Sequence, residues 1–262
     1  SLVGHAVRAF GMRLERRPRS YPIHRPAAAG RHFSRFLRAA SPCRFAAERS
    51  IIGAMNYANL EALHTAPLTT DPFPFLVAPG FLSAEDLATV NADYPAIDSA
   101  ANHALEDLSY GPAFARFVED LESDAFARLL SERFDMALAG LPSTITVRKF
   151  CERTDGNIHT DHKSKIITVL VYFNEHWTHT EGQLRMLRGK HDIDDYAAEV
   201  PPLGGTLLAF KRTPHSWHGH TRFVGERRIL QLNFLDRSPL SVASQRIARA
   251  GTHFAKNVLG LR

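Results

Sequence analysis

The stretch Lys165-Ile-Ile-Thr-Val-Leu-Val-Tyr-Phe-Asn174 is a run of β-branched, aliphatic and aromatic residues between two polar ends. A run of this kind is typical of a strand that is buried on both of its faces. We therefore expect residues 165–174 to form a central strand of a sheet, with the other strands arranged around it.

Further strand signals lie on both sides of this central run. They are short segments that alternate between apolar and polar residues or are rich in aliphatic residues, at 143–149, 182–188, 204–210, 217–221 and 227–235. We expect the last two to pair as a hairpin across the turn Phe223-Val-Gly-Glu226. Many short strands separated by turns predict a β-barrel or sandwich of the jelly-roll type.

Helical signals precede most of the strand signals. Ser83, with Asp86 three residues later, predicts a capped helix start, and Pro95 ends that helix. Aromatic residues and leucines recur at helical spacing in segments 113–122 and 124–138. We expect these helices to pack against one face of the β structure.

The first 54 residues differ from the rest of the chain in charge. They hold eleven arginines, no lysine and two acids, a net charge of +9, so the remaining residues carry −4 of the total of +5. We expect this segment to be disordered, because it cannot bury enough apolar surface to offset its ordering entropy. Three origins fit it: a mitochondrial transit peptide, a basic arm for an anionic partner, or translation from a start upstream of Met55. We favour the last.

The expected organisation is one folded domain after this extension. The extension covers 1–54 and the domain 55–262, with helical support at 80–140, a β core at 143–236 and a basic C-terminal helix at 241–258. No apolar run approaches the ~20 residues of a membrane span, and the mildly acidic body does not favour nucleic-acid binding. Cys43 and Cys151 are too few for a disulfide framework. We expect a soluble cytoplasmic protein, or a mitochondrial one if the transit peptide is genuine.

A histidine and a carboxylate stand two residues apart in Asn157-Ile-His159-Thr-Asp161-His162, just before the central run. In extended chain such residues point to the same side, so both can bind one metal ion. His218, in Ser216-Trp-His218, can supply a second imidazole from another strand. Two histidines and one carboxylate leave coordination positions open, which is typical of non-haem Fe(II) oxygenases. His220 has the same parity as His218 and remains the alternative ligand.

The adjacent arginines Arg227 and Arg228 face opposite sides of the last strand. Arg227 shares its face with Gln231 and Asn233, whereas Arg228 shares its face with leucines and a phenylalanine. A polar row suits the interior of a ligand-binding barrel. We therefore expect Arg227 to clamp a carboxylate, a task for which guanidinium geometry is well suited.

Tyr172 and Thr168 share one face of the central run by the same parity. Tyr172 could donate a hydrogen bond to the carboxylate that Arg227 binds, and the alternative is that it only packs in the core.

Several pieces of the sequence, in this order, resemble the Fe(II)/2-oxoglutarate-dependent dioxygenases of the prolyl-hydroxylase type, with the prolyl 4-hydroxylase α-subunit catalytic domain as the pattern. The pieces are His159-Thr-Asp161, Val171-Tyr-Phe-Asn174 with Trp177, Glu181-Gly-Gln-Leu-Arg-Met-Leu187, Gly205-Thr-Leu-Leu-Ala-Phe210, Ser216-Trp-His218, and Arg227 nine residues beyond His218. Gly182-Gln183 departs from the family's usual Gly-Gly. Such an ordered set is far more specific than a lone His-x-Asp pair.

The resemblance implies a double-stranded β-helix, a jelly-roll or cupin-like barrel in a mainly β, α+β fold buttressed by N-terminal helices. It implies His159, Asp161 and His218 as iron ligands and catalytic residues, and Arg227 as the anchor of 2-oxoglutarate. Three further residues complete the candidate cofactor-binding set. Tyr172 and Thr168 share one face of the central run, and Gln231 shares its face of the last strand with Arg227.

The activity implied is hydroxylation of an unactivated C–H bond, with release of succinate and carbon dioxide. The cofactors are Fe(II), with 2-oxoglutarate and dioxygen as co-substrates and ascorbate as a candidate reductant. The substrate is a peptidyl proline, an amino acid or a small metabolite, and the expected specificity loops at 96–112 and 189–203 do not distinguish these. The alternative is a non-catalytic metal-binding or structural relative that keeps the fold.

Overall fold

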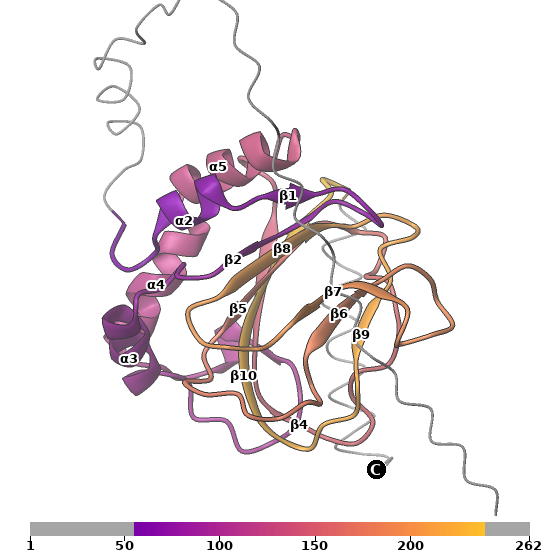
Figure 1. The fold of residues 1–262 in the computed structure, drawn as a ribbon. Helices are drawn as coiled ribbons and strands as arrows, with labels where there is room; N and C mark the ends of the chain where they lie inside the picture. The colour runs from indigo at the N-terminus through magenta and orange to yellow at the C-terminus, as the bar shows by residue number, and fades with distance from the viewer. Residues whose placement is uncertain (1–54, 239–262) are drawn as a thin grey trace, which may run out of the picture. The chain divides into compact units, whose positions relative to one another are not determined.

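The central strand predicted from the sequence is β5 (Lys165–Tyr172), which lies in the middle of the larger of two sheets (Figure 1). The computed structural model describes residues 55–238, which belong to one compact unit. The expected disordered extension 1–54 and the expected helix 241–258 lie outside the described residues.

Two sheets make up the β structure of residues 55–238. The larger has seven strands in the order β1-β2-β8-β5-β10-β4-β3, and the smaller has three in the order β7-β6-β9. Besides β5, the larger sheet contains β1 (Leu68–Thr69), β2 (Phe75–Ala78), β3 (His103–Ala104), β4 (Ser143–Cys151), β8 (Leu207–Lys211) and β10 (Gly225–Leu235). The smaller sheet contains β6 (Leu184–Leu187), β7 (Tyr196–Val200) and β9 (His218–His220). Figure 1 shows the smaller sheet in front of the larger one.

Two apolar clusters lie on opposite faces of the larger sheet, and β5 contributes to both. Val169 and Val171 pack with the helices, whereas Leu170 and Tyr172 pack with residues of the smaller sheet. Neighbouring side chains of a strand point to opposite faces, so one strand can line two clusters. Two facing antiparallel sheets with a helical layer behind one of them confirm the predicted mainly β, double-stranded β-helix fold.

The helices cover the outer face of the larger sheet (Figure 1). They are α2 (Leu60–Thr65), α3 (Ala84–Ala92), α4 (Pro112–Glu122) and α5 (Asp124–Phe134), with a 3-10 turn η1 at Leu105–Asp107. Ser83 caps α3 as its position predicts, and Ser123 caps α5, since each hydroxyl accepts a hydrogen bond from a first-turn N–H. Helix α5 ends four residues earlier than expected, because Asp135 takes a left-handed conformation with a φ of 49°.

Two expectations about the strands are wrong. Strands β9 and β10 do not form a hairpin: β9 pairs with β6 in the smaller sheet, and β10 pairs with β4 and β5 in the larger one. The chain between them crosses from one sheet to the other, as consecutive strands do in a jelly roll. The expected loop 189–203 contains β7, which is stabilised by pairing with β6 rather than by its own sequence.

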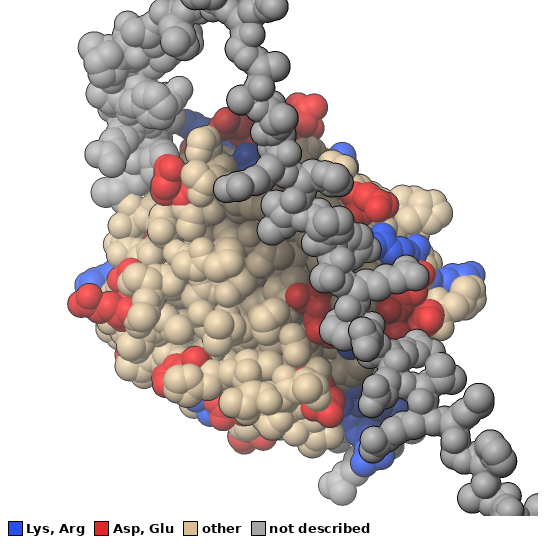
Figure 2. Space-filling view, viewed as in Figure 1, with Lys and Arg blue, Asp and Glu red and all other residues tan. Residues whose placement is uncertain are grey.

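Charged side chains on the face seen in Figure 2 lie mainly around its margin, with acids and bases mixed, and its centre is uncharged. Among the described residues, no helix is long and apolar enough to cross a membrane.

Asp120 on α4 joins the start of the described chain to the helical layer. Its buried carboxylate accepts hydrogen bonds from the backbone N–H groups of Asn56, Tyr57 and Ala58 at 2.7–2.9 Å, and from the Asn56 side chain at 2.9 Å. A single side chain therefore satisfies three consecutive backbone donors that belong to no helix or strand.

We predict that Asp120→Ala lowers the free energy of unfolding by about 3 kcal/mol, because three backbone donors lose their acceptor. Urea denaturation followed by circular dichroism measures the loss. Asp124→Ala is the matched control, since Asp124 is exposed and paired only with Arg128, and should cost at most about 1 kcal/mol. Equal losses in the two variants would contradict this role of Asp120.

Candidate active site

His159 and His218 face each other through two backbone hydrogen bonds. The N–H of His159 donates to the carbonyl of His218 at 3.0 Å, and the N–H of His218 donates to the carbonyl of His159 at 2.9 Å. This isolated antiparallel bridge joins the loop before β5 to the start of β9. It places the two imidazole rings 4.4 Å apart, centre to centre.

Both rings are fixed in the tautomer that can bind a metal ion. Nδ1 of His159 lies 2.9 Å from the carbonyl oxygen of Asn157, and Nδ1 of His218 lies 2.9 Å from that of Ser216. A carbonyl can only accept, so each Nδ1 carries the proton and each Nε2 offers a lone pair. Burial, and then the charge of His159, lower the pKa of His218 to about 4, so this ring is neutral at pH 7.

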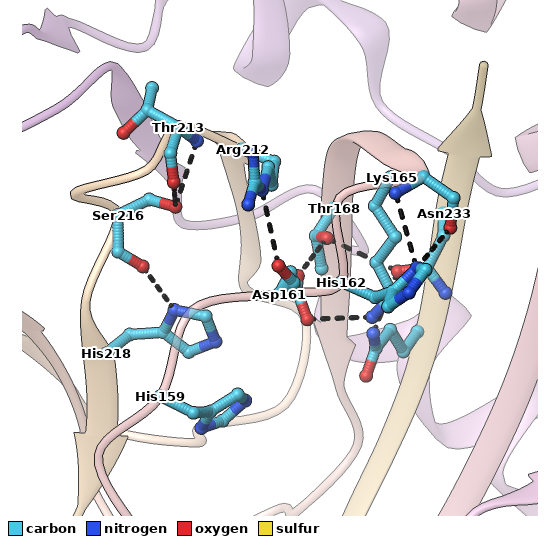
Figure 3. Close-up of polar contacts among 12 residues, drawn as sticks. His159, Asp161, His162, Lys165, Thr168, Arg212, Thr213, Ser216, His218 and Asn233 are labelled. Carbon is cyan, nitrogen blue, oxygen red and sulfur yellow. Dashed lines mark hydrogen bonds and ion pairs between the residues drawn. The ribbon is translucent and has the colours of Figure 1, made fainter. Parts of the chain in front are cut away.

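Asp161 is buried and held by two donors (Figure 3). Lys165 Nζ lies 2.8 Å from one carboxylate oxygen, and the Thr168 hydroxyl donates to the other at 2.5 Å. Burial raises the pKa of Asp161, but Lys165, His218 and Thr168 together lower it to about 2. The carboxylate is therefore ionised at neutral pH, and its orientation is set from two directions.

His159, Asp161 and His218 can offer one ligand atom each, and these atoms all lie within 4.8 Å of one another. Two imidazole nitrogens and one carboxylate oxygen are the donor set of the 2-His-1-carboxylate triad, which suits Fe(II). Within residues 55–238 this is the single group of its kind. The residues present therefore fit an iron ion that keeps open positions for other ligands.

A cavity of about 200 Å³ opens beside this triad, between the two sheets. Its lining includes the three triad residues, Arg227, Gln231, Thr168 and His220, together with Leu170, Leu184, Phe210 and Ile229. Three of the predicted candidates, Thr168, Arg227 and Gln231, reach the cavity from β5 and β10, as strand parity predicts. The cavity thus brings charged and apolar groups to the same place.

Arg227, which lines the cavity, and Tyr172, which lies beside Arg227 but outside the lining, carry unsatisfied polar atoms. Arg227 is buried, its Nε donates to the Gly182 carbonyl at 2.9 Å, and its guanidinium carbon lies 5.5 Å from the Tyr172 ring centre. Arg227 Nη2 and the Tyr172 hydroxyl are both buried and find no hydrogen-bond partner within residues 55–238. A buried donor without a partner is costly, so both atoms suit a ligand oxygen. A carboxylate fits this pair of donors.

Protonation also favours this role of Tyr172. Burial raises the pKa of its hydroxyl, and the nearby charge of Arg227 only partly offsets that effect, so the group is a donor at neutral pH. Arg228 points the other way: it donates to Asn91 Oδ1 at 3.1 Å and lies over the Tyr94 ring.

The structure gives the remaining candidates different surroundings. The hydroxyl of Thr168 is engaged by Asp161, so this residue contacts the triad rather than standing free for a co-substrate. Gln231 lines the cavity and donates to Asn233 at 2.8 Å. His220 also lines the cavity, but it lies outside the group of three whose ligand atoms converge.

Sequence reasoning missed Lys165 as a partner of Asp161, although its spacing four residues further on was a usable signal. It also missed Arg148, Asp155 and Asn102, which line the cavity. Arg148 alternates with buried Ile145 and Val147 on β4, and that alternation placed it on the inward face. No local signal pointed to Asn102, which reaches the cavity through the fold alone.

Comparison with known proteins gives a family match over about a third of the chain. Residues 147–235 match the sequence model of the 2OG-Fe(II) oxygenase superfamily, and this stretch contains the triad and Arg227. The predicted resemblance to Fe(II)/2-oxoglutarate oxygenases is thereby confirmed over this stretch, and so is the prediction of an oxygenase enzyme. No curated protein matches the chain.

Solved structures are similar to the chain at low identity. A prolyl-4-hydroxylase from Pseudomonas putida is 18% identical, covering 63% of this chain and 88% of its own, with a TM-score of 0.45. HygX from Streptomyces hygroscopicus, solved with nickel and 2-oxoglutarate, is 14% identical over 69% and 88%, with a TM-score of 0.43. The viral collagen prolyl hydroxylase of Paramecium bursaria Chlorella virus-1 is 13% identical over 62% and 96%, with a TM-score of 0.40.

We predict that the metal-free protein loses stability as pH falls from about 6.5 to about 4. The pKa of His218 is about 4 in the folded state and about 6.5 when unfolded, so the unfolded chain binds more protons in this window. The loss reaches about 3 kcal/mol at most from this residue. Urea denaturation in chelator at several pH values should show a smaller slope for His218→Gln. The exposed His215→Gln controls for the substitution, and an unchanged slope in His218→Gln would contradict the prediction.

Proposed function

We propose that the protein is an Fe(II)- and 2-oxoglutarate-dependent hydroxylase whose iron is bound by His159, Asp161 and His218. The observation that carries the proposal is the pair of unsatisfied buried donors on Arg227 and Tyr172, in the immediate surroundings of the cavity that contains the triad. Metal binding alone would need only the triad. A carboxylate site beside it is what a 2-oxoglutarate-dependent oxygenase requires in addition.

The protein's share of iron binding is to hold three neutral or anionic donors in one geometry. The Nδ1–H donors to backbone carbonyls orient the two imidazoles, and Lys165 and Thr168 orient the Asp161 carboxylate. Such support fixes ligand orientation and limits the rearrangement that loading a metal requires. With three protein donors, a bound metal ion would keep coordination positions for other ligands.

The chain would bind the co-substrate between a charged end and an apolar wall of the cavity. Arg227 and Tyr172 would bind the carboxylate of 2-oxoglutarate that is remote from the iron, through Nη2 and the hydroxyl. Leu170, Leu184 and Ile229 would pack along its methylene groups and exclude water. Gln231 also lines the cavity and is the remaining polar candidate.

When bound, iron with 2-oxoglutarate and dioxygen would supply the oxidation, in which the co-substrate yields succinate and carbon dioxide and a C–H bond of the substrate is hydroxylated. The substrate is a peptidyl proline, an amino acid or a small metabolite. We also propose that ascorbate serves as the reductant and that the protein is located in the cytoplasm.

The triad is tested by anaerobic titration of the full chain with Fe(II) and 2-oxoglutarate. We expect a weak visible charge-transfer band, which Asp161→Ala and His159→Ala should abolish because each removes one of three metal ligands. His220→Ala is the matched control, since it removes the neighbouring cavity histidine and should keep the band. Loss of the band in His220→Ala but not in His218→Ala would exchange these two assignments.

Arg227 is tested by its effect on 2-oxoglutarate affinity. Arg227→Met should raise the dissociation constant of 2-oxoglutarate about 100-fold, because a buried carboxylate would lose its charged partner. Affinity for the metal should change little. Arg228→Met is the control, since Arg228 faces the helical layer, and it should stay within about threefold of the native protein. Isothermal titration with Mn(II)-loaded protein measures both, and equal effects would overturn the assignment.

A further inference from the structure

A second arginine, Arg148 on β4, lines the same cavity and is not used by the proposed cofactor chemistry. Its Nε donates to Asn102 Oδ1 at 2.9 Å, and its Nη1 forms an ion pair with Asp155 Oδ2 at 2.6 Å. The two charged side chains are only 14% and 15% exposed. A charged pair so little exposed is expensive to desolvate, and its place in a cavity wall gives it access to a ligand.

Strand order separates this pair from the proposed 2-oxoglutarate site. Tyr172 lies on β5 and Arg227 on the neighbouring β10, whereas Arg148 lies one strand further, on β4, opposite Ile229 of β10. Adjacent strands are about 4.8 Å apart. The floor of the cavity is therefore divided: Arg227 stands over β10, whereas Arg148 stands over β4, with Asp155 supplied by the loop that follows β4.

The lining of the same cavity also offers acceptors. Gln231 donates through Nε2 to Asn233, so its Oε1 remains as an acceptor in the cavity. His220 donates through Nδ1 to the Thr221 carbonyl at 2.8 Å, so its Nε2 is an acceptor as well. The charges of Arg227, Asp155 and Arg148 all affect the pKa of its ring. This end of the cavity thus offers a cationic fork and an anion, with neutral acceptors beside them.

We propose that this end of the cavity is the substrate subsite and that the substrate is a small zwitterion of the α-amino acid class. Arg148 binds the substrate carboxylate, and Asp155 with Gln231 binds its ammonium group. The planar guanidinium suits a carboxylate, and the Asp155 carboxylate suits an ammonium ion. A residue within a peptide has neither charge and gains nothing from the pair. The inference rests on the proposed function, since it names the substrate of that same site.

The test measures binding and turnover separately on the full chain. The probes are the free L-α-amino acids, singly, and the same compounds with an acetylated amine and an amidated carboxyl. Saturation-transfer NMR on Zn(II)-loaded protein with 2-oxoglutarate reports binding without catalysis, and succinate release with Fe(II) reports turnover. We expect at least one free amino acid to bind and to raise succinate release, and its blocked form to bind about 30-fold more weakly or worse.

The decisive variant replaces both charges, Arg148→Gln with Asp155→Asn, so that neither is left buried without a partner. It should lose amino-acid binding about 30-fold or more while the dissociation constant of 2-oxoglutarate stays within about threefold. Arg148→Lys keeps the charge without the fork and should be intermediate. The control is Arg185→Gln with Glu199→Gln, an ion pair of 2.6 Å on the smaller sheet outside the cavity lining, which should bind as the native protein does.

Three results would overturn the inference: no binding by any free amino acid, equal binding of free and blocked forms, or unchanged binding in the double variant with its fold intact by circular dichroism. Failure of the proposed function is distinguishable, because it would abolish succinate release and metal-dependent 2-oxoglutarate binding while leaving amino-acid binding in place.

Discussion

The two backbone hydrogen bonds between His159 and His218 are the constraint on which the site depends. They connect the loop that leads into the central strand of the larger sheet with the first residue of β9 in the smaller sheet. His159 itself lies in no strand, so the bridge, together with the hydrogen bond from the His220 N–H to the Gly156 carbonyl at 3.0 Å, holds this loop against β9. The geometry of the triad is therefore a consequence of how the sheets are joined, not of either sheet alone.

Charged and polar side chains around the triad are buried among apolar residues. Asp161 is ionised because Lys165 and Thr168 outweigh the cost of its burial, and His218 is neutral because burial and a neighbouring ring disfavour its proton. The same burial leaves Arg227 and Tyr172 with unsatisfied donors on an inward face of the larger sheet. A protein that keeps such groups out of water gives up folding stability at that place. Binding of an anion would recover it, which links the cost to a function.

Periodicity explains which parts of the fold were predictable. The apolar run of β5 predicted the central strand, and the alternation in β10 placed Arg227 and Arg228 on opposite faces, where the structure has them. Partner choice is not local: β9 is adjacent to β10 in sequence, yet it pairs with β6, so the expected hairpin was wrong. Strand β7 likewise exists through its pairing with β6. The site followed the same division. The i and i+2 spacing indicated the His159–Asp161 pair, and alternation on β4 was a usable signal for Arg148, whereas Asn102 required the tertiary fold.

Tyr94 shows how the helical layer acts on the cavity floor. Its hydroxyl donates to the Arg148 carbonyl at 2.7 Å and accepts from the Ile229 N–H at 3.1 Å, and so stands in the ladder between β4 and β10. The register of these strands shifts between Glu226 and Ile229, immediately around Arg227. The Tyr94 ring packs edge-on against Phe114 of α4 and Phe173 beyond β5. One side chain from the helical layer thus contacts the backbone of Arg148 and of Ile229, two residues beyond Arg227. The packing of the helices on the sheet therefore contributes to the positions of both cavity arginines.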